Sequence, residues 1–293
     1  MTMARPVEMA AKPRKQSSEA LRIFLHDPAG LTGLALLLVV VAMVVIGPFL
    51  YPVDPFDIVW MPFSPPFAEG APLLGTDQLG RDLLAGIING GRATLAVGAA
   101  AAAITCVIGT FVGAVAGFYG GRVDAMLARV TEFFQVLPPL LFAMVIVALF
   151  TPSLWLVAFS IGIVSWPSVA RLTRGEFLRL KNLEFVTASR AAGAVDSTLI
   201  WSVIFPNALP PLIIAATMNV ATAILFESGL SFLGLSDPNV MSWGLIIGNG
   251  RENMFTAWWI STLPGIAIFV TALGISLLGD GMNDAFNPKL RRR

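Results

Sequence analysis

The side chains that most often carry catalysis are scarce in this chain of 293 residues. It has one cysteine, Cys106, and one histidine, His26. These two residues cannot assemble a zinc shell or the usual cysteine–histidine nucleophile pair, and Cys106 has no partner for an internal disulfide. We therefore expect no catalytic, metal-binding or cofactor-binding residues in the chain, and no thiol chemistry.

One segment has two glycines spaced as in a phosphate-binding loop. It contains Gly75, Thr76, Asp77, Gly80, Arg81 and Asp82. A phosphate-binding loop has lysine and then serine or threonine directly after the second glycine, whereas Arg81 and Asp82 stand there in this chain. We therefore interpret the segment as structural. We expect Asp77, Arg81 and Asp82 to pair with one another and with backbone groups, and so to fix a short helix.

Glu227 stands at the outer end of the long apolar stretch 197–226, and no other acidic residue lies within the long apolar stretches of the sequence. An ionisable group at membrane depth is costly unless it is paired, so it is a candidate for function. Two interpretations stay open for Glu227: a structural hydrogen bond near the end of a span, or a role in a gate or in the substrate path. A proton relay has no other visible members.

The composition places these residues in a membrane protein. Hydrophobic residues make up 56% of the chain and charged residues only 13%, against roughly a quarter charged in soluble domains. The net charge of +1 provides no basic excess for nucleic acid, so we expect no nucleic-acid partner.

Charge-free stretches predict six transmembrane helices in an all-α membrane protein. They cover residues 31–50, 93–119, 133–170, 197–226 and 253–279. The 38 residues of the third stretch would extend about 57 Å as one helix, nearly twice the hydrocarbon thickness of about 30 Å. We therefore divide it into two spans at Thr151-Pro152-Ser153, because proline cannot continue a helix.

Basic residues predict which side each loop occupies. Of the 19 lysines and arginines, all but Arg81, Arg92 and Arg251 lie in the two tails and in the loops on the same side. Cytoplasmic loops are enriched in these residues, so both termini are predicted to be cytoplasmic. The expected organisation is a cytoplasmic tail (1–27), a first span (28–50), an external loop (51–92), a five-helix core (93–279) with a cytoplasmic loop (171–209), and a second tail (280–293).

A stripe of small residues lies along the second predicted span. Gly109, Gly113, Gly117 and Gly121 repeat every four residues, a spacing that lets another helix approach closely. The partner helix could belong to this chain or to a second subunit.

The cytoplasmic loop contains a helix-compatible segment that a glycine ends. Its candidate residues are Glu184, Thr187, Ala188, Ser189, Arg190 and Gly193. The basic flank would suit a helix lying on lipid, whereas the small side chains favour docking into a cleft of another protein. The loop is too short to hold a nucleotide-hydrolysing domain, so another chain would have to supply any energy.

At this loop the sequence resembles the permease subunits of bacterial ABC importers. Their signature is Glu-Ala-Ala, three residues, Gly, nine residues, Ile, one residue, Leu-Pro. Here Thr187-Ala188-Ser189 stands at its start, Gly193 matches, and Val203 and then Phe205-Pro206 stand at its end. The external segment from Leu74 to Asp82, together with Gly229 to Leu235 and Trp243-Gly244, is similar to the "C"-type subunit of dipeptide and oligopeptide permeases.

The resemblance implies the type I permease fold of ABC importers and a place in a bacterial inner membrane. It implies four kinds of partner: a homologous second permease forming a heterodimer, two ATPase subunits that hold ATP and magnesium, an extracytoplasmic binding protein, and membrane lipid. The loop with Glu184, Gly193 and Pro206 would couple the permease to an ATPase, and the function would be peptide uptake. The alternatives are an importer of nickel or another small solute, a carrier or channel acting alone, and a membrane-embedded enzyme.

Overall fold

A computed structural model describes residues 21–286, and this part of the chain is helical apart from two isolated bridges in the loop before residue 83. Five helices are long and apolar enough to cross a membrane. They are α2 (Pro28–Leu50), α3 (Leu83–Tyr119), α6 (Leu154–Leu180), the helix Asp196–Phe232 and α11 (Trp259–Phe286). Residues 1–20 and 287–293 of the two predicted tails lie outside the described residues, whereas residues 280–286, predicted to begin the second tail, continue α11.

A bent pair of helices makes a sixth span when the two are counted as one. α4 (Gly121–Val136) and α5 (Pro139–Ala148) meet at an angle of 81°. The sequence analysis placed no break here, because it began this span at residue 133 and so left α4 out. The charges of Arg122, Asp124 and Glu132 hid α4 from a search for apolar stretches. Pro138 and Pro139 explain the bend, since proline disfavours helix in the residue before it.

The break predicted at residues 151–153 separates α5 from α6. The Ser153 hydroxyl accepts a hydrogen bond from the backbone N–H of Leu156 at 3.3 Å and caps the new helix. α6 then runs on to Leu180, so residues 171–180 are helical and the connection is shorter than the predicted loop of 171–209.

That connection contains three short helical segments. They are α7 (Glu184–Ala191), α8 (Asp196–Thr198) and the π-helical η1 (Leu199–Ile204), which leads into α9 (Phe205–Phe232). After α9, the chain forms α10 (Trp243–Gly250) and η2 (Arg251–Asn253) before α11.

α3 and α6 pack closely through the glycine stripe. An added side chain at Gly109 would meet Val169, one at Gly113 would meet the Ala170 carbonyl oxygen, and one at Gly117 would meet Phe177. The stripe therefore lies against α6 of the same chain. Gly121 is not part of this seam: it has no neighbour within 4 Å and a φ of +54°, and it starts α4.

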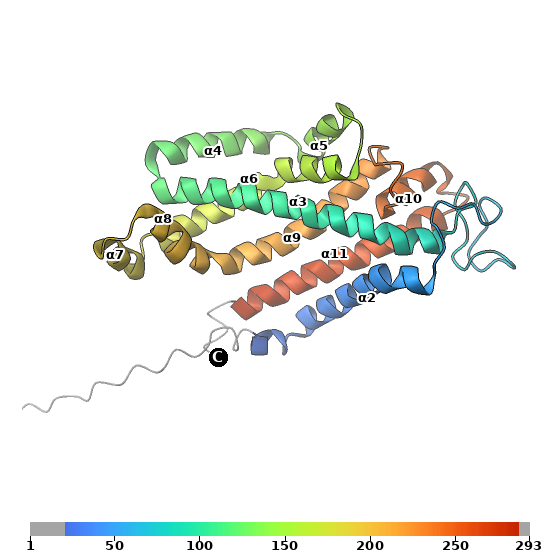
Figure 1. Ribbon diagram of the computed structural model, residues 1–293, viewed down its shortest axis with the longest axis horizontal. Helices are drawn as coiled ribbons and strands as arrows, with labels where there is room; N and C mark the ends of the chain where they lie inside the picture. Colours follow the sequence, from blue (N-terminus) through green and yellow to red (C-terminus); the bar gives the residue numbers. More distant parts are fainter. Residues whose placement is uncertain (1–20, 287–293) are drawn as a thin grey trace, which may run out of the picture.

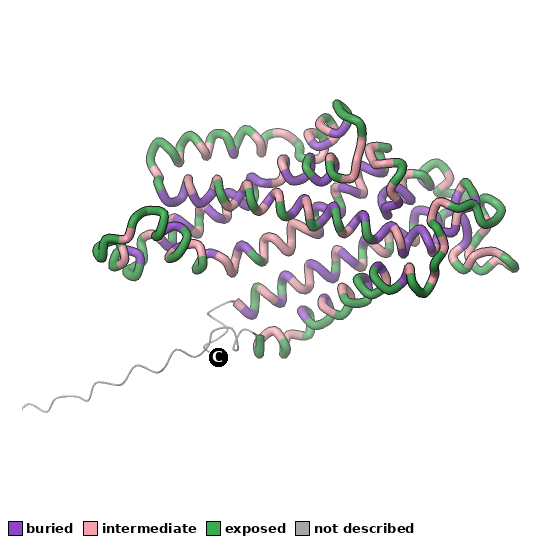
Figure 2. The backbone as a smooth tube through the Cα atoms, viewed as in Figure 1, coloured by how far each residue is buried: buried purple, intermediate pink, exposed green. Residues whose placement is uncertain are grey.

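The two ends of the helix bundle differ (Figure 1). The loop 51–82 and α10 lie at one end, and α7 projects from the other, where α3 and α6 also finish. The start of α2 and the end of α11 meet through Gly30 and Gly281 and point towards the α7 end. Exposed residues follow the outer sides of α2 and α4 (Figure 2), whereas α3, α6 and α9 share a buried core.

Gly113→Ala tests the α3–α6 seam. The added methyl group must displace α6 backbone, and overpacking of this kind costs about 1–3 kcal/mol. We expect the melting temperature of the purified protein to fall by several degrees. Gly175→Ala on α6 is the matched control, because nothing lies within 4 Å of it. Equal melting temperatures for the two variants would contradict the seam.

Candidate functional site

The external motif folds the loop before α3 into a tight cap. The Asp77 carboxylate accepts the backbone N–H groups of Leu79 at 2.8 Å and Arg81 at 2.9 Å. The Thr76 hydroxyl donates to the Met61 carbonyl oxygen at 2.7 Å and accepts the Ser64 N–H at 3.0 Å. These bonds satisfy the backbone of a loop that has no regular secondary structure.

Gly75 and Gly80 are required at the turns of this cap. Their φ angles are +77° and +81°, which few residues other than glycine adopt. An added side chain would also overlap the Ser64 carbonyl oxygen at Gly75 and the Trp60 carbonyl oxygen at Gly80. The glycine spacing that resembles a phosphate-binding loop thus serves the folding of the cap.

Asp82 joins the cap to the first long core helix. Its carboxylate accepts the N–H groups of Leu84 at 2.8 Å and Ala85 at 3.2 Å, which caps α3. It also accepts the Tyr51 hydroxyl at 2.5 Å. Asp82 therefore starts a helix of 37 residues, where the sequence analysis expected a short one. Tyr51 was missed, although it stands directly after the first apolar stretch.

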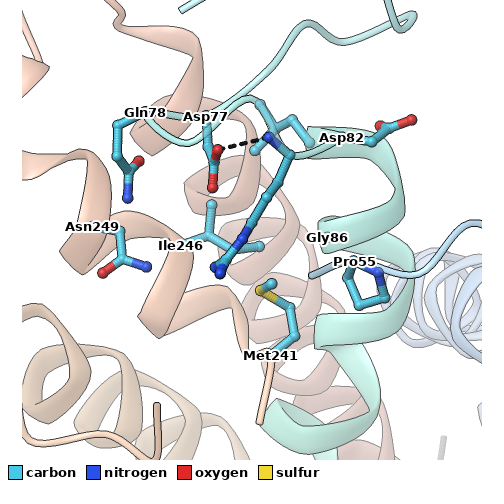
Figure 3. Close-up of a pocket in the computed structure, with 10 residues that line it drawn as sticks. Pro55, Asp77, Gln78, Asp82, Gly86, Met241, Ile246 and Asn249 are labelled. Carbon is cyan, nitrogen blue, oxygen red and sulfur yellow. Dashed lines mark hydrogen bonds between the residues drawn. The ribbon is translucent and has the colours of Figure 1, made fainter. Parts of the chain in front are cut away.

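Arg81 bonds to Asp77 through its backbone N–H, but its guanidinium group forms no ion pair with Asp77 or Asp82 among residues 21–286. Its guanidinium group lies 5.1 Å from the centre of the Phe56 ring, and its Nε atom is buried without a hydrogen-bond partner. Figure 3 shows the small pocket that these loop residues line, with Gln78 directed towards Asn249 of α10. The pocket volume of about 10 Å³ matches a single water molecule.

Glu227 connects α9 to α10. It is 3% exposed, and its carboxylate accepts the hydroxyl groups of Ser231 and Ser242, each at 2.9 Å. Ser242 also accepts the Leu245 N–H at 3.1 Å and so caps α10. Of the two interpretations left open, the geometry supplies the structural hydrogen bond directly.

Trp243 holds α10 against α3 from the other side. Its indole N–H donates to the Ile87 carbonyl oxygen at 2.8 Å, and its backbone N–H donates to the Thr94 hydroxyl at 3.1 Å. Together with Glu227, this residue fixes α10 at the end of the bundle that carries the cap.

At the opposite end, α7 presents almost all of its side chains to solvent. Only Val186 is buried, at 1% exposure, within a cluster that includes Phe118 and Leu199. The hydroxyl groups of Thr187 and Ser189 donate to carbonyl oxygens within the helix, at 2.9 and 2.8 Å. The outer surface contains Glu184, Thr187, Ala188 and Arg190, and none of them forms an ion pair among the described residues.

The end of α7 is a Schellman motif around Gly193. The Ala194 N–H donates to the Ser189 carbonyl oxygen at 3.1 Å, and the Gly193 N–H donates to the Arg190 carbonyl oxygen at 3.0 Å. Gly193 has a φ of +92°. The sequence analysis expected this glycine to end the helix, and the structure supplies the physical reason.

Three side-chain contacts tie together the helices at the α7 end. The Lys181 ammonium group donates to the Gly117 carbonyl oxygen at 2.8 Å, which satisfies the C-terminus of α3. Arg190 lies 5.7 Å from the centre of the Phe118 ring. Arg174 forms a bidentate ion pair with Asp124, at 2.5 and 2.7 Å, between α6 and α4. The sequence analysis missed this pair because the two residues stand 50 positions apart.

Pro206 lies in the first turn of α9, directly after the π-helical turn. The Phe205 N–H reaches back to the Ile200 carbonyl oxygen, one residue further than in an α-helix. Proline lacks an N–H and its ring crowds the preceding turn, so the wider π-turn relieves that crowding.

Comparison with known proteins now identifies the family. The profile described as "Binding-protein-dependent transport system inner membrane component" matches residues 109–292, which include α7, Glu227 and α10. The chain belongs to this family. A second profile, "N-terminal TM domain of oligopeptide transport permease C", matches residues 15–66.

Individual relatives support the same assignment. This permease is 38% identical to the di/tripeptide transport system permease protein DppC of Pseudomonas aeruginosa over 92% of its own length and 90% of the relative. It is 36% identical to the oligopeptide transport system permease protein OppC of Haemophilus influenzae, over 97% and 92% of the two chains. The predicted resemblance to the dipeptide and oligopeptide permeases is therefore confirmed.

A solved structure confirms the fold. The permease matches a chain of the inward-facing MetNI methionine ABC transporter with a TM-score of 0.57, at 18% identity, over 69% of its own length and 97% of the other chain. The apolar helices and the relatives together identify a multi-pass protein of the inner membrane.

Asp82→Asn tests the junction between the cap and α3. The hydrogen bond to Asp82 is the largest of the effects that raise the pKa of Tyr51 from 10.0 to about 12. The neutral hydroxyl is favoured, so the contribution of this bond to stability is complete below pH 10 and is lost as the pH rises towards 12. In a Tyr119→Phe background, which leaves Tyr51 as the only tyrosine, Asp82→Asn should move the tyrosinate titration midpoint back towards 10.

Asp77→Asn is the control for this titration, since Asp77 bonds to its own turn and not to Tyr51. A midpoint near 10 in the protein that retains Asp82 would show that the bond does not form.

Proposed function

We propose that this chain is one membrane subunit of an ATP-driven importer of dipeptides or oligopeptides, and that it pairs with a homologous permease. The exposed surface of α7 would dock onto one of two ATPase subunits, and the cap end would receive an extracytoplasmic binding protein. The chain itself would hold neither ATP nor magnesium and would catalyse no reaction. The names of its relatives, which are dipeptide and oligopeptide permeases, support this substrate class.

The observation that carries the proposal is the placement of α7. This helix is exposed on every side except at Val186, yet it is attached to the ends of α3 and α6 through Lys181 and Arg190. A force applied to α7 would therefore reach two long helices that are packed together through glycines. The basic residues of this end favour a cytoplasmic location, where ATPase subunits could reach it.

An importer of nickel or another small solute would use the same architecture, so uptake assays decide between these substrates. A carrier acting alone is less well supported. Glu227, the acid buried within α9, already accepts hydrogen bonds from the hydroxyl groups of Ser231 and Ser242, which favours a structural role over ion coupling.

Gly193→Val tests the coupling role of α7. A β-branched residue at a φ of +92° introduces strain of about 1–2 kcal/mol, and that strain displaces the end of the helix. In the complete complex reconstituted into liposomes, we expect ATP hydrolysis to continue while peptide uptake per ATP falls by about 5–30-fold, the factor that this energy represents.

Gly193→Asn is the matched control, because asparagine tolerates a positive φ and should retain most of the uptake. Normal coupling in Gly193→Val would contradict the proposed role.

A further inference from the structure

A groove with both apolar and polar side chains lies among the long helices of the permease. Its volume is about 350 Å³, and it lies between the bend of α4 and α5, one face of α6 and one face of α9. Its polar lining comes from Gln135, Ser165, Ser168, Arg171, Asn219 and Thr222. A second cavity of about 190 Å³ shares Gln135 and Arg171 and extends the groove between α3, α4 and α6, where Glu132 and Arg174 also line it.

Three polar residues of α6 recur every three positions. Ser165, Ser168 and Arg171 therefore share one face of the helix. Ser168 and Arg171 are exposed. Residues 133–170 carry no charge, so Arg171 is the first charged residue after that stretch. A face of this kind is unfavourable against hydrocarbon, so it must face water or another protein.

Arg171 differs from the other basic residues between positions 171 and 209. Between residues 171 and 209, Arg174 pairs with Asp124, Arg179 with Glu176, Lys181 with the end of α3, and Arg190 with Phe118. The Arg171 side chain makes no hydrogen bond, ion pair or ring contact with any residue in the described range of 21–286. Its charge is therefore available to a group outside this chain.

Gln135 provides a second unused group in the groove. Its side-chain nitrogen is buried and has no hydrogen-bond partner among the described residues. On the facing helix, the Asn219 side-chain nitrogen donates to the Ala215 carbonyl oxygen at 2.7 Å, which leaves the amide oxygen of Asn219 as an acceptor. The groove thus offers a donor, an acceptor and a cation.

We propose that this groove lines the translocation path and that Arg171 binds the C-terminal carboxylate of the passing peptide. A peptide fits the three groups: its backbone amides need donors and acceptors, and its free carboxylate is the natural partner of an arginine. Arg171 lies nine residues before the end of α6, about 14 Å along the helix, so it contacts the carboxylate in the part of the path nearest α7. This inference rests on the proposed function of peptide uptake.

Labelling of single cysteines tests whether the groove contains water. In a Cys106→Ala background, Ser168→Cys should react with a charged, water-soluble thiol reagent in the nucleotide-free complex. Phe111→Cys should not react, because Phe111 lies on an exposed apolar face of α3. The two positions lie at a similar depth, since Gly109 packs against Val169. Equal labelling of both, or labelling of Phe111→Cys alone, would overturn the assignment of the path.

Uptake by the reconstituted complex tests Arg171. We expect Arg171→Gln to reduce the initial uptake rate of a free-acid peptide by about ten-fold, the loss of one charge-assisted hydrogen bond, and Arg171→Lys to restore part of it. The preference for the free acid over its C-terminal amide should shrink in Arg171→Gln, because the cation that meets the carboxylate is lost. The binding protein is the same in both complexes, so any preference that it sets is unchanged. Arg129→Gln, an exposed arginine outside the groove, should stay near the wild-type rate.

The outcomes separate the two proposals. A wild-type complex that imports no peptide would refute the proposed function. A wild-type complex that imports peptides while Arg171→Gln retains its full rate and preference would refute only the role of Arg171. An equal loss for the acid and the amide, as expected if Arg171 binds lipid headgroups or the second permease, would also overturn the carboxylate contact.

Discussion

A polar group within hydrocarbon must find its partner inside the protein, and the architecture of this permease follows from that constraint. Glu227 is buried because Ser231 and Ser242 donate to it, and the same bonds fix α10 at the end of the bundle. Lys181 satisfies the last carbonyl groups of α3, and in doing so joins the connection before α7 to the core. Two side chains with groups unpartnered among the described residues, Arg171 and Gln135, lie along the groove, where something other than lipid must meet them.

The two ends of the molecule are built for different tasks, and α3 connects them. At one end, Asp82 caps α3 and holds the loop 51–82 through Tyr51. At the other, the C-terminus of α3 contacts Lys181, beside α7. Between them, the glycine stripe lets α6 lie so close that the two helices must move together. This rigid pair is well suited to transmit a movement of α7 across the membrane, while the bent pair α4 and α5 borders the groove.

The sequence was sufficient to predict the number of spans, the α7 segment and the family, because each depends on a local signal. Long stretches without charge indicate the spans, a glycine at the end of a helical segment indicates α7, and motifs in a fixed order indicate the family. The break at Ser153 and the helix end at Gly193 were predicted for the same reason. The bend at Pro138 was missed because α4 carries charges, and so it did not resemble a span. The pair of Arg174 with Asp124 and the lone position of Arg171 depend on helices that meet only in the fold. No pattern along the chain distinguishes a paired arginine from an unpaired one.

Cross-linking from α7 tests the central claim most directly. With Cys106→Ala as the background, Ala188→Cys places a single reactive thiol on the exposed surface of α7, and Ile58→Cys places one on the exposed surface of the cap. The account predicts that, in native membranes, a short cross-linker joins Ala188→Cys to an ATP-binding subunit and does not join Ile58→Cys to it. A cross-link to that subunit from Ile58→Cys, or none from Ala188→Cys in a complex that transports, would contradict the account.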